Sequence, residues 1–262
     1  MKTAFIVAAL GLTVGALIFA LQRKLIYFPD PSAPTLPDAD RERGFEDVQI
    51  RTADGLPLRA WHRPPAPGHP TVLIFHGNAG HRGDRLDLIR YLADLGLGVL
   101  ALDYRGYGGS EGAPSETGLY ADAEAAVGWL EARGLERLVY FGESLGTGVA
   151  VELATRRAPE KLVLEAAFDS VVAVGQRAYP ILPVSWMLRD RFESDRKIAA
   201  VQAPLLMLHG TEDDIIPLDH GRRLFDRAKE PKRFVVLEGA GHNDLRLTGD
   251  AYFGPLKAFL LD

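Results

Sequence analysis

The sequence predicts an open α/β sheet in which most strands are parallel and helices cover both faces. Short apolar runs recur along the chain, and stretches with the apolar spacing of amphipathic helices alternate with them. Continuous apolar runs are typical of strands that are buried on both faces, as in parallel sheets. The 262 residues also suffice for one domain with a large core. Right-handed crossovers then place helices on the two sides of the sheet.

The first segment departs from this pattern. Residues 3–21 carry no charge, whereas Lys2 precedes them and Arg23 and Lys24 follow them. As a helix, this stretch spans about 28 Å, close to the ~30 Å hydrocarbon core of a bilayer. We therefore expect residues 1–24 to form a single transmembrane anchor. A cleaved signal peptide is the alternative, and the flanking charges leave the orientation in the membrane open.

Prolines dominate the stretch that follows the apolar segment. The sequence PDPSAPTLP, from Pro29 to Pro37, is unsuited to a helix or a central strand. We interpret residues 25–43 as a semi-rigid spacer and residues 44–262 as the globular domain.

The globular domain is predicted to begin with an antiparallel hairpin around Asp54-Gly55, a common turn sequence. About five parallel strands and their crossover helices follow. The expected strands are Phe45–Arg51, Leu56–His62, Thr71–His76, Leu97–Leu102, Leu138–Phe141, Leu162–Leu164, Leu205–Leu208 and Phe234–Leu237. The expected helices are Asp84–Leu95, Thr117–Arg133, Leu145–Arg156, Leu218–Lys229 and Tyr252–Leu261. In open sheets of this kind, functional residues are expected beyond the carboxyl ends of the strands.

The composition excludes several classes of function. A net charge of −5 argues against a broad nucleic-acid-binding surface, which would need a basic stripe. The chain contains no cysteine, so disulfides, thiolate metal sites and a cysteine nucleophile are all excluded.

Two stretches match the pattern G-x-S-x-G, one centred on Ser110 and one on Ser144. Ser144 directly follows the expected strand Leu138–Phe141 and precedes the expected helix Leu145–Arg156. This strand–turn–helix context exposes a nucleophilic serine at the top of a sheet. Ser110 lies in a glycine-rich loop, eight residues past its strand, and no helix follows it. We therefore assign Ser144 as the nucleophile and Ser110 as a turn residue.

A serine nucleophile needs a base, and a third group must orient that base. Three histidines follow Ser144 in the chain. His242 lies in a glycine-rich loop just past the strand Phe234–Leu237, where a catalytic base is expected. His209 ends a strand, and His220 is interpreted as a partly exposed residue of a helix.

The acid that orients the base is expected just past the strand Leu205–Leu208. Glu212, Asp213 and Asp214 are adjacent there, and spacing alone does not choose among them.

These motifs resemble those of the α/β-hydrolase superfamily, and more closely those of its BEM46-like group of membrane-tethered hydrolases. The resemblance covers nearly the whole chain after the spacer, and Leu25–Pro29 (LIYFP) also resembles that group's pattern. It rests on five motifs in the same order: Phe75–Gly80 (FHGNAG), Asp103–Gly108 (DYRGYG), Gly142–Gly146 (GESLG), His209–Pro217 (HGTEDDIIP) and Gly241–Asp244 (GHND). The resemblance implies the α/β-hydrolase fold with a short helical cap.

The resemblance also assigns roles to individual residues. In the family's HGxxDxxVP motif the acid is the fifth residue, which corresponds to Asp213 here. The family's oxyanion hole uses two backbone N–H groups, which correspond here to those of Leu145 and Asn78. Such donors stabilise the charge that develops on the carbonyl oxygen, and losing one typically lowers the rate by ~10²–10³.

The family's cap corresponds to about residues 170–203. It contains the apolar, proline-interrupted stretch Tyr179–Leu188. We interpret Tyr179, Leu182 and Trp186 as candidate residues for binding the acyl group. A patch that lies against a bilayer and an ordinary buried cap helix are the alternatives.

The expected function is two-step acyl transfer by a Ser144–His242–Asp213 triad, which needs no metal or organic cofactor. The acyl group belongs to a carboxyl ester, a thioester or a lipid. One alternative is an aminopeptidase that holds the substrate amine through Glu193 and Asp195. Another is a non-catalytic scaffold, which the complete triad disfavours.

The N-terminal segment is expected to confine the enzyme to a membrane without taking part in the chemistry. A chain that begins near Pro31 should then hydrolyse a small, water-soluble ester as fast as the full chain does.

Overall fold

The computed structural model of the chain describes residues 19–262. Most of the predicted anchor, residues 1–18, therefore lies outside the described residues. Within residues 19–262, no helix has both the length and the apolar character needed to cross a membrane.

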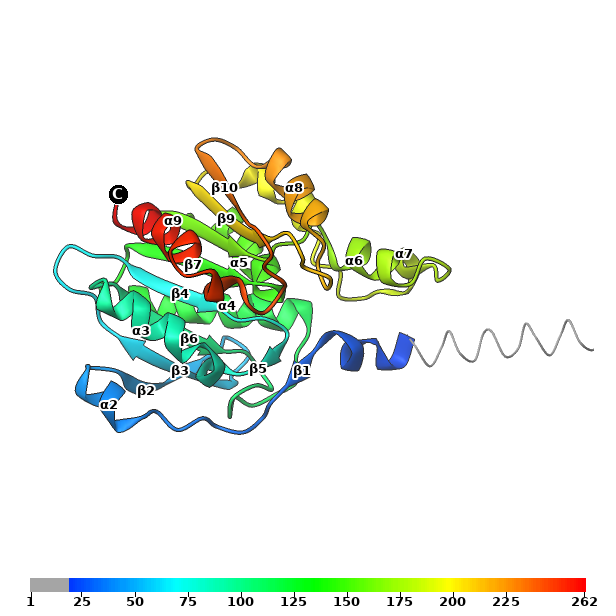
Figure 1. Cartoon of the computed structure of the whole chain (residues 1–262). Coiled ribbons are helices and arrows are strands. Elements are labelled where there is room, and N and C mark those ends of the chain that lie inside the picture. Colours follow the sequence, from blue (N-terminus) through cyan, green and yellow to red (C-terminus); the bar gives the residue numbers. More distant parts are fainter. Residues whose placement is uncertain (1–18) are drawn as a thin grey trace, which may run out of the picture.

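Eight strands form the central sheet, in the order β10-β9-β8-β7-β4-β6-β3-β2 (Figure 1). The six strands from β10 to β6 are parallel, whereas β3 pairs antiparallel with β6 and β2 pairs antiparallel with β3. The predicted fold class and the N-terminal hairpin are confirmed, with six parallel strands where about five were expected. The strands are β2 (Glu46–Arg51), β3 (Pro57–Arg63), β4 (Thr71–Phe75), β6 (Gly98–Asp103), β7 (Leu138–Glu143), β8 (Lys161–Glu165), β9 (Leu205–Gly210) and β10 (Lys232–Leu237).

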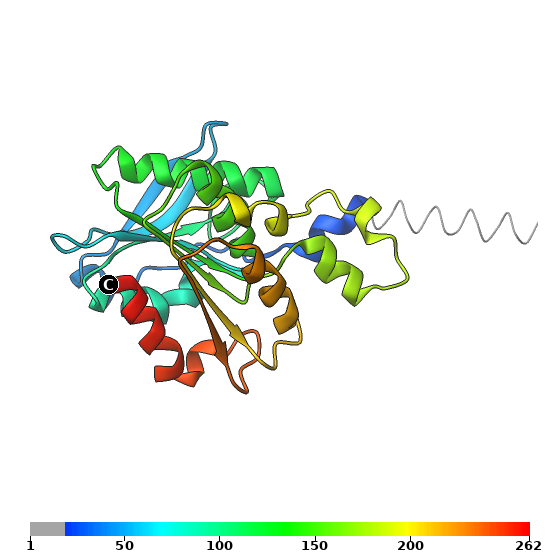
Figure 2. The ribbon, with the colours of Figure 1, turned by 90° about the horizontal axis from the view of Figure 1, so that it is seen from above.

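Helices cover both faces of the sheet (Figure 2). Successive side chains of β4 illustrate the two layers, because Leu73 and Phe75 contribute to one apolar core and Val72 and Ile74 to the other. The first core lies under α4 (Glu116–Glu131), α5 (Leu145–Arg156) and α8 (Leu218–Arg227). The second core lies under α3 (Leu86–Asp94) and α9 (Asp250–Leu261). Burial on both faces explains why the strands read as continuous apolar runs.

The cap is the insertion between β8 and β9. It consists of α6 (Val171–Ala178), α7 (Val184–Met187) and the single turns η2 (Ser194–Arg196) and η3 (Ile198–Ala200). Ser170 caps the N-terminus of α6, because its side-chain Oγ accepts a hydrogen bond from the backbone N–H of Ala173. The cap projects from the sheet at the end where the parallel strands terminate (Figure 1).

Residues 19–43 pack against the domain. They are the described part of the stretch that we interpreted as anchor and spacer. Residues 19–26 are helical, and β1 (Phe28–Pro29) pairs with β5 (Ala79–Gly80). Tyr27 and Leu36 are buried. The stretch interpreted as a semi-rigid spacer, residues 25–43, therefore packs against the domain, because the side chains of Tyr27 and Leu36 are buried in the core.

A short helix also forms in this stretch, α2 (Asp38–Glu42), which the prolines had hidden. Its Asp40 is fully buried and accepts hydrogen bonds from the Arg90 guanidinium on α3 at 2.9 and 2.8 Å. This ion pair attaches the stretch to the helical layer of the second core.

Candidate active site

Ser144 lies in the tight turn between β7 and α5, in the strand–turn–helix context that the sequence predicts. Its backbone φ is 50° and its ψ is −117°, a strained conformation for a residue with a side chain. Close packing around the turn explains the two flanking glycines. A Cβ on Gly146 would lie 2.0 Å from the carbonyl oxygen of Phe75, and one on Gly142 would lie 2.7 Å from the oxygen of Gly146.

Ser144, His242 and Asp213 form a continuous hydrogen-bonded chain. Ser144 Oγ lies 2.9 Å from His242 Nε2, and His242 Nδ1 lies 2.8 Å from Asp213 Oδ2. An ionised carboxylate can only accept hydrogen bonds, so Nδ1 carries the ring proton and Nε2 accepts the proton of the serine hydroxyl. The three residues follow β7, β10 and β9 at their carboxyl ends. In this geometry an imidazole can remove the serine proton.

Asp213 is held ionised and in one orientation. Its Oδ1 accepts hydrogen bonds from the backbone N–H groups of Ile215 and Ile216, at 3.1 and 2.7 Å. Burial alone would raise the pKa of Asp213, but the hydrogen bonds from His209 and His242 lower that pKa below the usual range of an aspartate. The carboxylate is therefore available to stabilise an imidazolium on His242.

The neighbours of Asp213 are placed differently, which settles the choice that spacing left open. Glu212 and Asp214 are both exposed, whereas Asp213 is buried beside His242. Of the three adjacent acids, only Asp213 makes the hydrogen bond to the ring.

The other candidate histidines have structural contacts. His209 is fully buried, and its Nε2 donates to the carbonyl oxygen of Ile216, so the ring supports the loop that holds Asp213. The expectation that His220 is partly exposed is wrong, because it is buried and its Nδ1 lies 2.7 Å from Asp169 Oδ1. Asp169 lies in the loop after β8 and contacts His220 on α8. The spacing of residues within the helix does not reveal such a long-range contact.

Ser110 makes only structural contacts. Its Oγ accepts a hydrogen bond from the Arg59 N–H at 2.8 Å and donates one to the Asp103 carbonyl at 2.9 Å. These bonds join the glycine-rich loop to β3 and β6, so the interpretation of Ser110 as a turn residue is confirmed.

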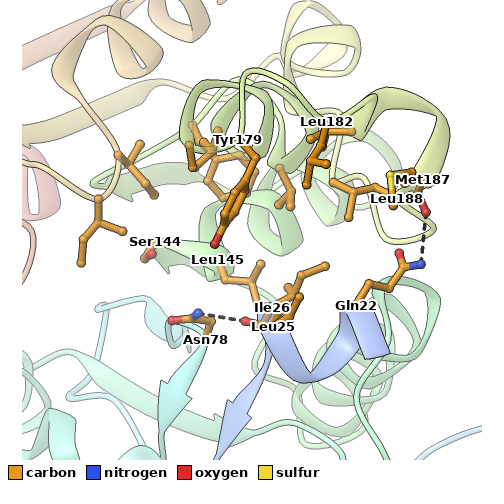
Figure 3. A pocket seen from close by; sticks show the side chains of 18 residues that line it. Gln22, Leu25, Ile26, Asn78, Ser144, Leu145, Tyr179, Leu182, Met187 and Leu188 are labelled. Atoms are coloured by element: carbon orange, nitrogen blue, oxygen red, sulfur yellow. Dashed lines mark hydrogen bonds between the residues drawn. The ribbon is translucent and has the colours of Figure 1, made fainter. Parts of the chain in front are cut away.

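Asn78 and Leu145 lie beside Ser144 and line the same cavity (Figure 3). Leu145 is the first residue of α5, and the first N–H groups of a helix have no partner within it. Asn78 is fixed by its side chain, which donates to the Ile26 carbonyl at 2.8 Å, and by its own carbonyl, which accepts from Phe28 N–H. Both backbone N–H groups are thus carried on rigid supports next to the serine.

A cavity of about 370 Å³ extends from Ser144 under the cap. Its lining is almost entirely apolar and comes from the cap, from residues 22–26 and from the loop that contains Ile215 and Ile216 (Figure 3). Tyr179 and Leu182 line it. The volume lies within the ~300–1,000 Å³ typical of small-molecule sites.

Trp186 does not line this cavity, contrary to expectation. Its side chain is 90% exposed. The reason is helical geometry, because Val184 and Met187 are three residues apart on the single turn of α7 and both face the cavity, which turns Trp186 outward.

The N-terminal segment forms one wall of the cavity, through Gln22, Leu25 and Ile26 (Figure 3). Buried Gln22 donates to the Met187 carbonyl at 3.1 Å and accepts from the Arg189 N–H at 2.6 Å. The cap is therefore fastened to the N-terminal segment along the wall of the cavity.

An ion pair and a hydrogen bond also attach the cap to the N-terminal segment. Asp190 is 3% exposed and accepts hydrogen bonds from Arg23 Nε at 2.8 Å and from the Tyr27 hydroxyl at 3.1 Å. The described residues of this segment therefore do more than connect the domain to the residues before them, because they form part of the cavity wall.

Sequence reasoning also missed a network of charges behind the nucleophile. Arg246, four residues after His242, donates to Glu143 at 2.7 Å and to Glu165 at 3.0 Å, and Arg85 donates to Glu143 at 2.6 Å. Burial alone would raise the pKa of Glu143, but the two guanidinium groups lower it to about 2. Glu143 precedes Ser144, so the network joins the serine turn to the loop that carries the histidine. The only sequence signal was a charged residue at the variable position of GESLG.

The chain is similar to several known proteins. A family model described as "Serine aminopeptidase, S33" matches residues 66–194. The chain is 45% identical to the uncharacterized protein Rv2307c of Mycobacterium tuberculosis, over 98% of this chain and 93% of that protein. It is 33% identical to the alpha/beta hydrolase domain-containing protein WAV2 of Arabidopsis thaliana, over 89% of this chain and 85% of that protein.

Two further comparisons concern lipases and esterases. The chain is 31% identical to the lysophosphatidylserine lipase ABHD12 of Danio rerio, over 81% of this chain and 68% of that protein. Among solved structures, an esterase of Pyrococcus furiosus, PF2001, matches with a TM-score of 0.73 and 21% identity, over 90% of this chain and 97% of the esterase. This last likeness concerns the fold alone.

Proposed function

Because the chain belongs to the α/β-hydrolase superfamily, we propose that it is a membrane-held serine hydrolase that cleaves carboxyl esters or thioesters of long acyl chains. The observation that carries this proposal is the hydrogen-bonded chain from Ser144 through His242 to Asp213, which opens into an apolar cavity. The uncharged run of residues 3–21 is the reason to propose membrane attachment, as in the BEM46-like group.

The proposed mechanism has two steps. His242 Nε2 takes the proton of Ser144 as its oxygen attacks the acyl carbonyl, and the same proton then passes to the leaving group. The backbone N–H groups of Asn78 and Leu145 donate to the carbonyl oxygen as it becomes negative. Water, deprotonated by His242, then releases the acyl group from the serine. Asp213 keeps the ring in the tautomer that both steps need.

The lining of the cavity supports an acyl chain as the group bound there. Apart from Ser144, only Gln22, Asn78 and the Tyr179 hydroxyl contribute polar side-chain atoms among the described lining residues, and none of the lining side chains is charged. The Danio rerio relative is a lysophosphatidylserine lipase, and a lysophospholipid carries a single acyl chain. We therefore propose that lipids with one acyl chain are the natural class of substrate.

A peptidase that binds a free amine is the alternative, and the family model's description favours it. Such an enzyme needs an unpaired acid near the serine. Glu193 pairs with Arg191 and Arg196, whereas Asp195 pairs with Arg227, and neither acid lines the cavity. These pairings favour the acyl hydrolase.

The test is a series of p-nitrophenyl esters of increasing acyl length, run beside aminoacyl amides on the full chain. Each methylene that the cavity buries contributes about 0.8 kcal/mol, so kcat/KM should rise at least ~10-fold between acetate and octanoate. Faster cleavage of the amides would favour the peptidase. Absence of turnover, together with no labelling of Ser144 by a fluorophosphonate, would leave only the scaffold.

A substitution inside the cavity should change the preference for long over short acyl chains. Val174 lines the cavity from α6, so Val174→Phe should fill part of it and lower kcat/KM for octanoate at least ~10-fold while acetate changes less than threefold. Val172 lies on the same helix but outside the lining, which makes Val172→Phe the matched control. An equal fall for both esters in Val174→Phe would show that the cavity does not hold the acyl chain.

A further inference from the structure

Exposed apolar side chains are concentrated on one part of the surface. Six of the eleven large hydrophobic side chains that are exposed within residues 19–262 come from two short segments, residues 19–25 and 179–186. Ile181 and Trp186 are almost fully exposed, at 95% and 90%. We call this surface the cap face, which consists of Phe19, Leu21, Leu25, Tyr179, Ile181 and Trp186.

The two segments form one continuous surface. The Arg189 guanidinium, just after α7, lies 5.3 Å from the ring centre of Phe19, and Gln22 bonds to the backbone on both sides of Leu188. Both views place the helical residues 19–26 beside α6 and α7, at the end of the molecule away from α9 (Figures 1 and 2).

The charges around the cap face are mostly positive. Residues 19–26 and 177–191 contain five arginines and lysines and one acid, Asp190, which is buried and paired with Arg23. Arg177 and Arg191 are paired with acids from outside these segments. Lys24 and Arg189 are exposed and form no ion pair within residues 19–262. Cations beside an exposed apolar patch match the anionic headgroups and the acyl region of a lipid surface.

The chain that precedes the described residues has a matching character. Residues 3–18 carry no charge, and the described chain starts on the cap face with Phe19. In the sequence, this apolar run continues into Phe19 without an intervening polar residue. Tryptophan and tyrosine, both present on the face, are also the side chains that favour the boundary between lipid and water.

The acyl cavity opens on the same face. Leu25 and Tyr179 line the cavity and are also 63% and 60% exposed, so they lie at its mouth. The close-up shows the two residues approaching from opposite segments (Figure 3).

We propose that the cap face docks onto an anionic lipid bilayer, with Ile181 and Trp186 inserted among the acyl chains, and that the lipid substrate enters the cavity between Leu25 and Tyr179 without crossing water. This inference rests on the proposed function for the identity of the substrate, but the docking itself does not depend on catalysis.

The docking is tested by the fluorescence of Trp186 in the full chain, reconstituted into phosphatidylglycerol vesicles whose acyl chains carry bromine. Bromine quenches tryptophan only at close range, and of the other two tryptophans Trp61 is buried and Trp129 is partly buried on α4. We expect quenching in the wild type and at least a threefold smaller fractional effect in Trp186→Phe. Equal quenching in both proteins would overturn the docking.

A matched control places a tryptophan elsewhere. Leu247 is 86% exposed on η4 (Leu245–Thr248), in the segment just before α9. Both views place α9 at the end of the molecule away from α6 and α7 (Figures 1 and 2). Leu247→Trp in the Trp186→Phe background should not restore quenching, and restoration would overturn the assignment of the face. Vesicles of zwitterionic phosphatidylcholine should quench Trp186 less, whereas equal quenching in both lipids would overturn the role of the charges.

Activity provides a second readout. Ile181 lies outside the cavity lining, so Ile181→Glu should lower hydrolysis of a long-chain ester embedded in the vesicles at least ~10-fold and leave p-nitrophenyl acetate hydrolysis within twofold. Leu247→Glu should change neither activity. If Ile181→Glu keeps its activity in vesicles, docking through this face is wrong. If the wild type hydrolyses neither ester, the proposed function fails, and the quenching still decides the docking.

Discussion

Ser144→Ala is expected to lower kcat/KM on p-nitrophenyl acetate by about 10⁴-fold or more without changing the fold. The hydroxyl is the only group of the described residues that bonds to His242 Nε2, and its removal leaves the imidazole without a nucleophile to deprotonate. Alanine is also small enough to occupy the strained turn, so the circular dichroism spectrum should stay unchanged. Labelling by a fluorophosphonate should disappear together with the activity.

Ser110→Ala is the matched control, because it alters the other serine in a G-x-S-x-G sequence. It removes two structural hydrogen bonds, to Arg59 N–H and to the Asp103 carbonyl, which together stabilise the fold by about 1–3 kcal/mol. We expect a lower melting temperature with kcat/KM within about threefold of wild type. Loss of labelling in Ser110→Ala and its retention in Ser144→Ala would reverse the assignment.

The fold and the triad geometry could be predicted because their signals are local. Strands such as β4 are buried on both faces and therefore read as apolar runs, and the helices between them have their own spacing. The serine turn has a strong local signature, since backbone atoms crowd Gly142 and Gly146 and allow only glycine. The strand order places the ends of β10, β9 and β7 at one edge of the sheet, with only β8 between β9 and β7, so the residues that follow these strands can meet.

The features that were missed depend on pairings between distant residues. Nothing near Arg246 in the sequence indicates that it reaches Glu143, more than one hundred residues earlier. His220 was misjudged for the same reason, because its partner Asp169 comes from the loop after β8. Trp186 points away from the cavity because α7 is a single turn that begins at Val184. The prolines around this stretch make that starting residue hard to predict from the sequence.

The N-terminal segment was misjudged because its composition suggests independence. Residues 1–24 have the composition of a membrane anchor and residues 25–43 that of a proline-rich spacer, yet Arg23 pairs with a buried carboxylate 167 positions away. Removing this segment therefore affects more than attachment to a membrane. Four contacts to the cavity and its surroundings disappear together, those of Gln22, Arg23, Tyr27 and Phe28.

A chain that begins at Pro31 is consequently expected to lose at least ~100-fold in kcat/KM on p-nitrophenyl acetate, whereas a chain that begins at Phe19 stays within about threefold of the full chain. Without residues 19–30, Asp190 loses both Arg23 and Tyr27, the partners that hold this part of the cap against the N-terminal segment. Asn78 also loses the Ile26 carbonyl and the Phe28 N–H that fix it, and displacement of one oxyanion donor alone lowers rates by ~10²–10³. The two truncated chains differ only in residues 19–30, so comparing their rates and melting temperatures separates the packed part of the segment from the apolar residues that precede it. Equal rates in both would restore the tether interpretation. A loss of similar size in the chain that begins at Phe19 would instead assign the effect to the residues before it.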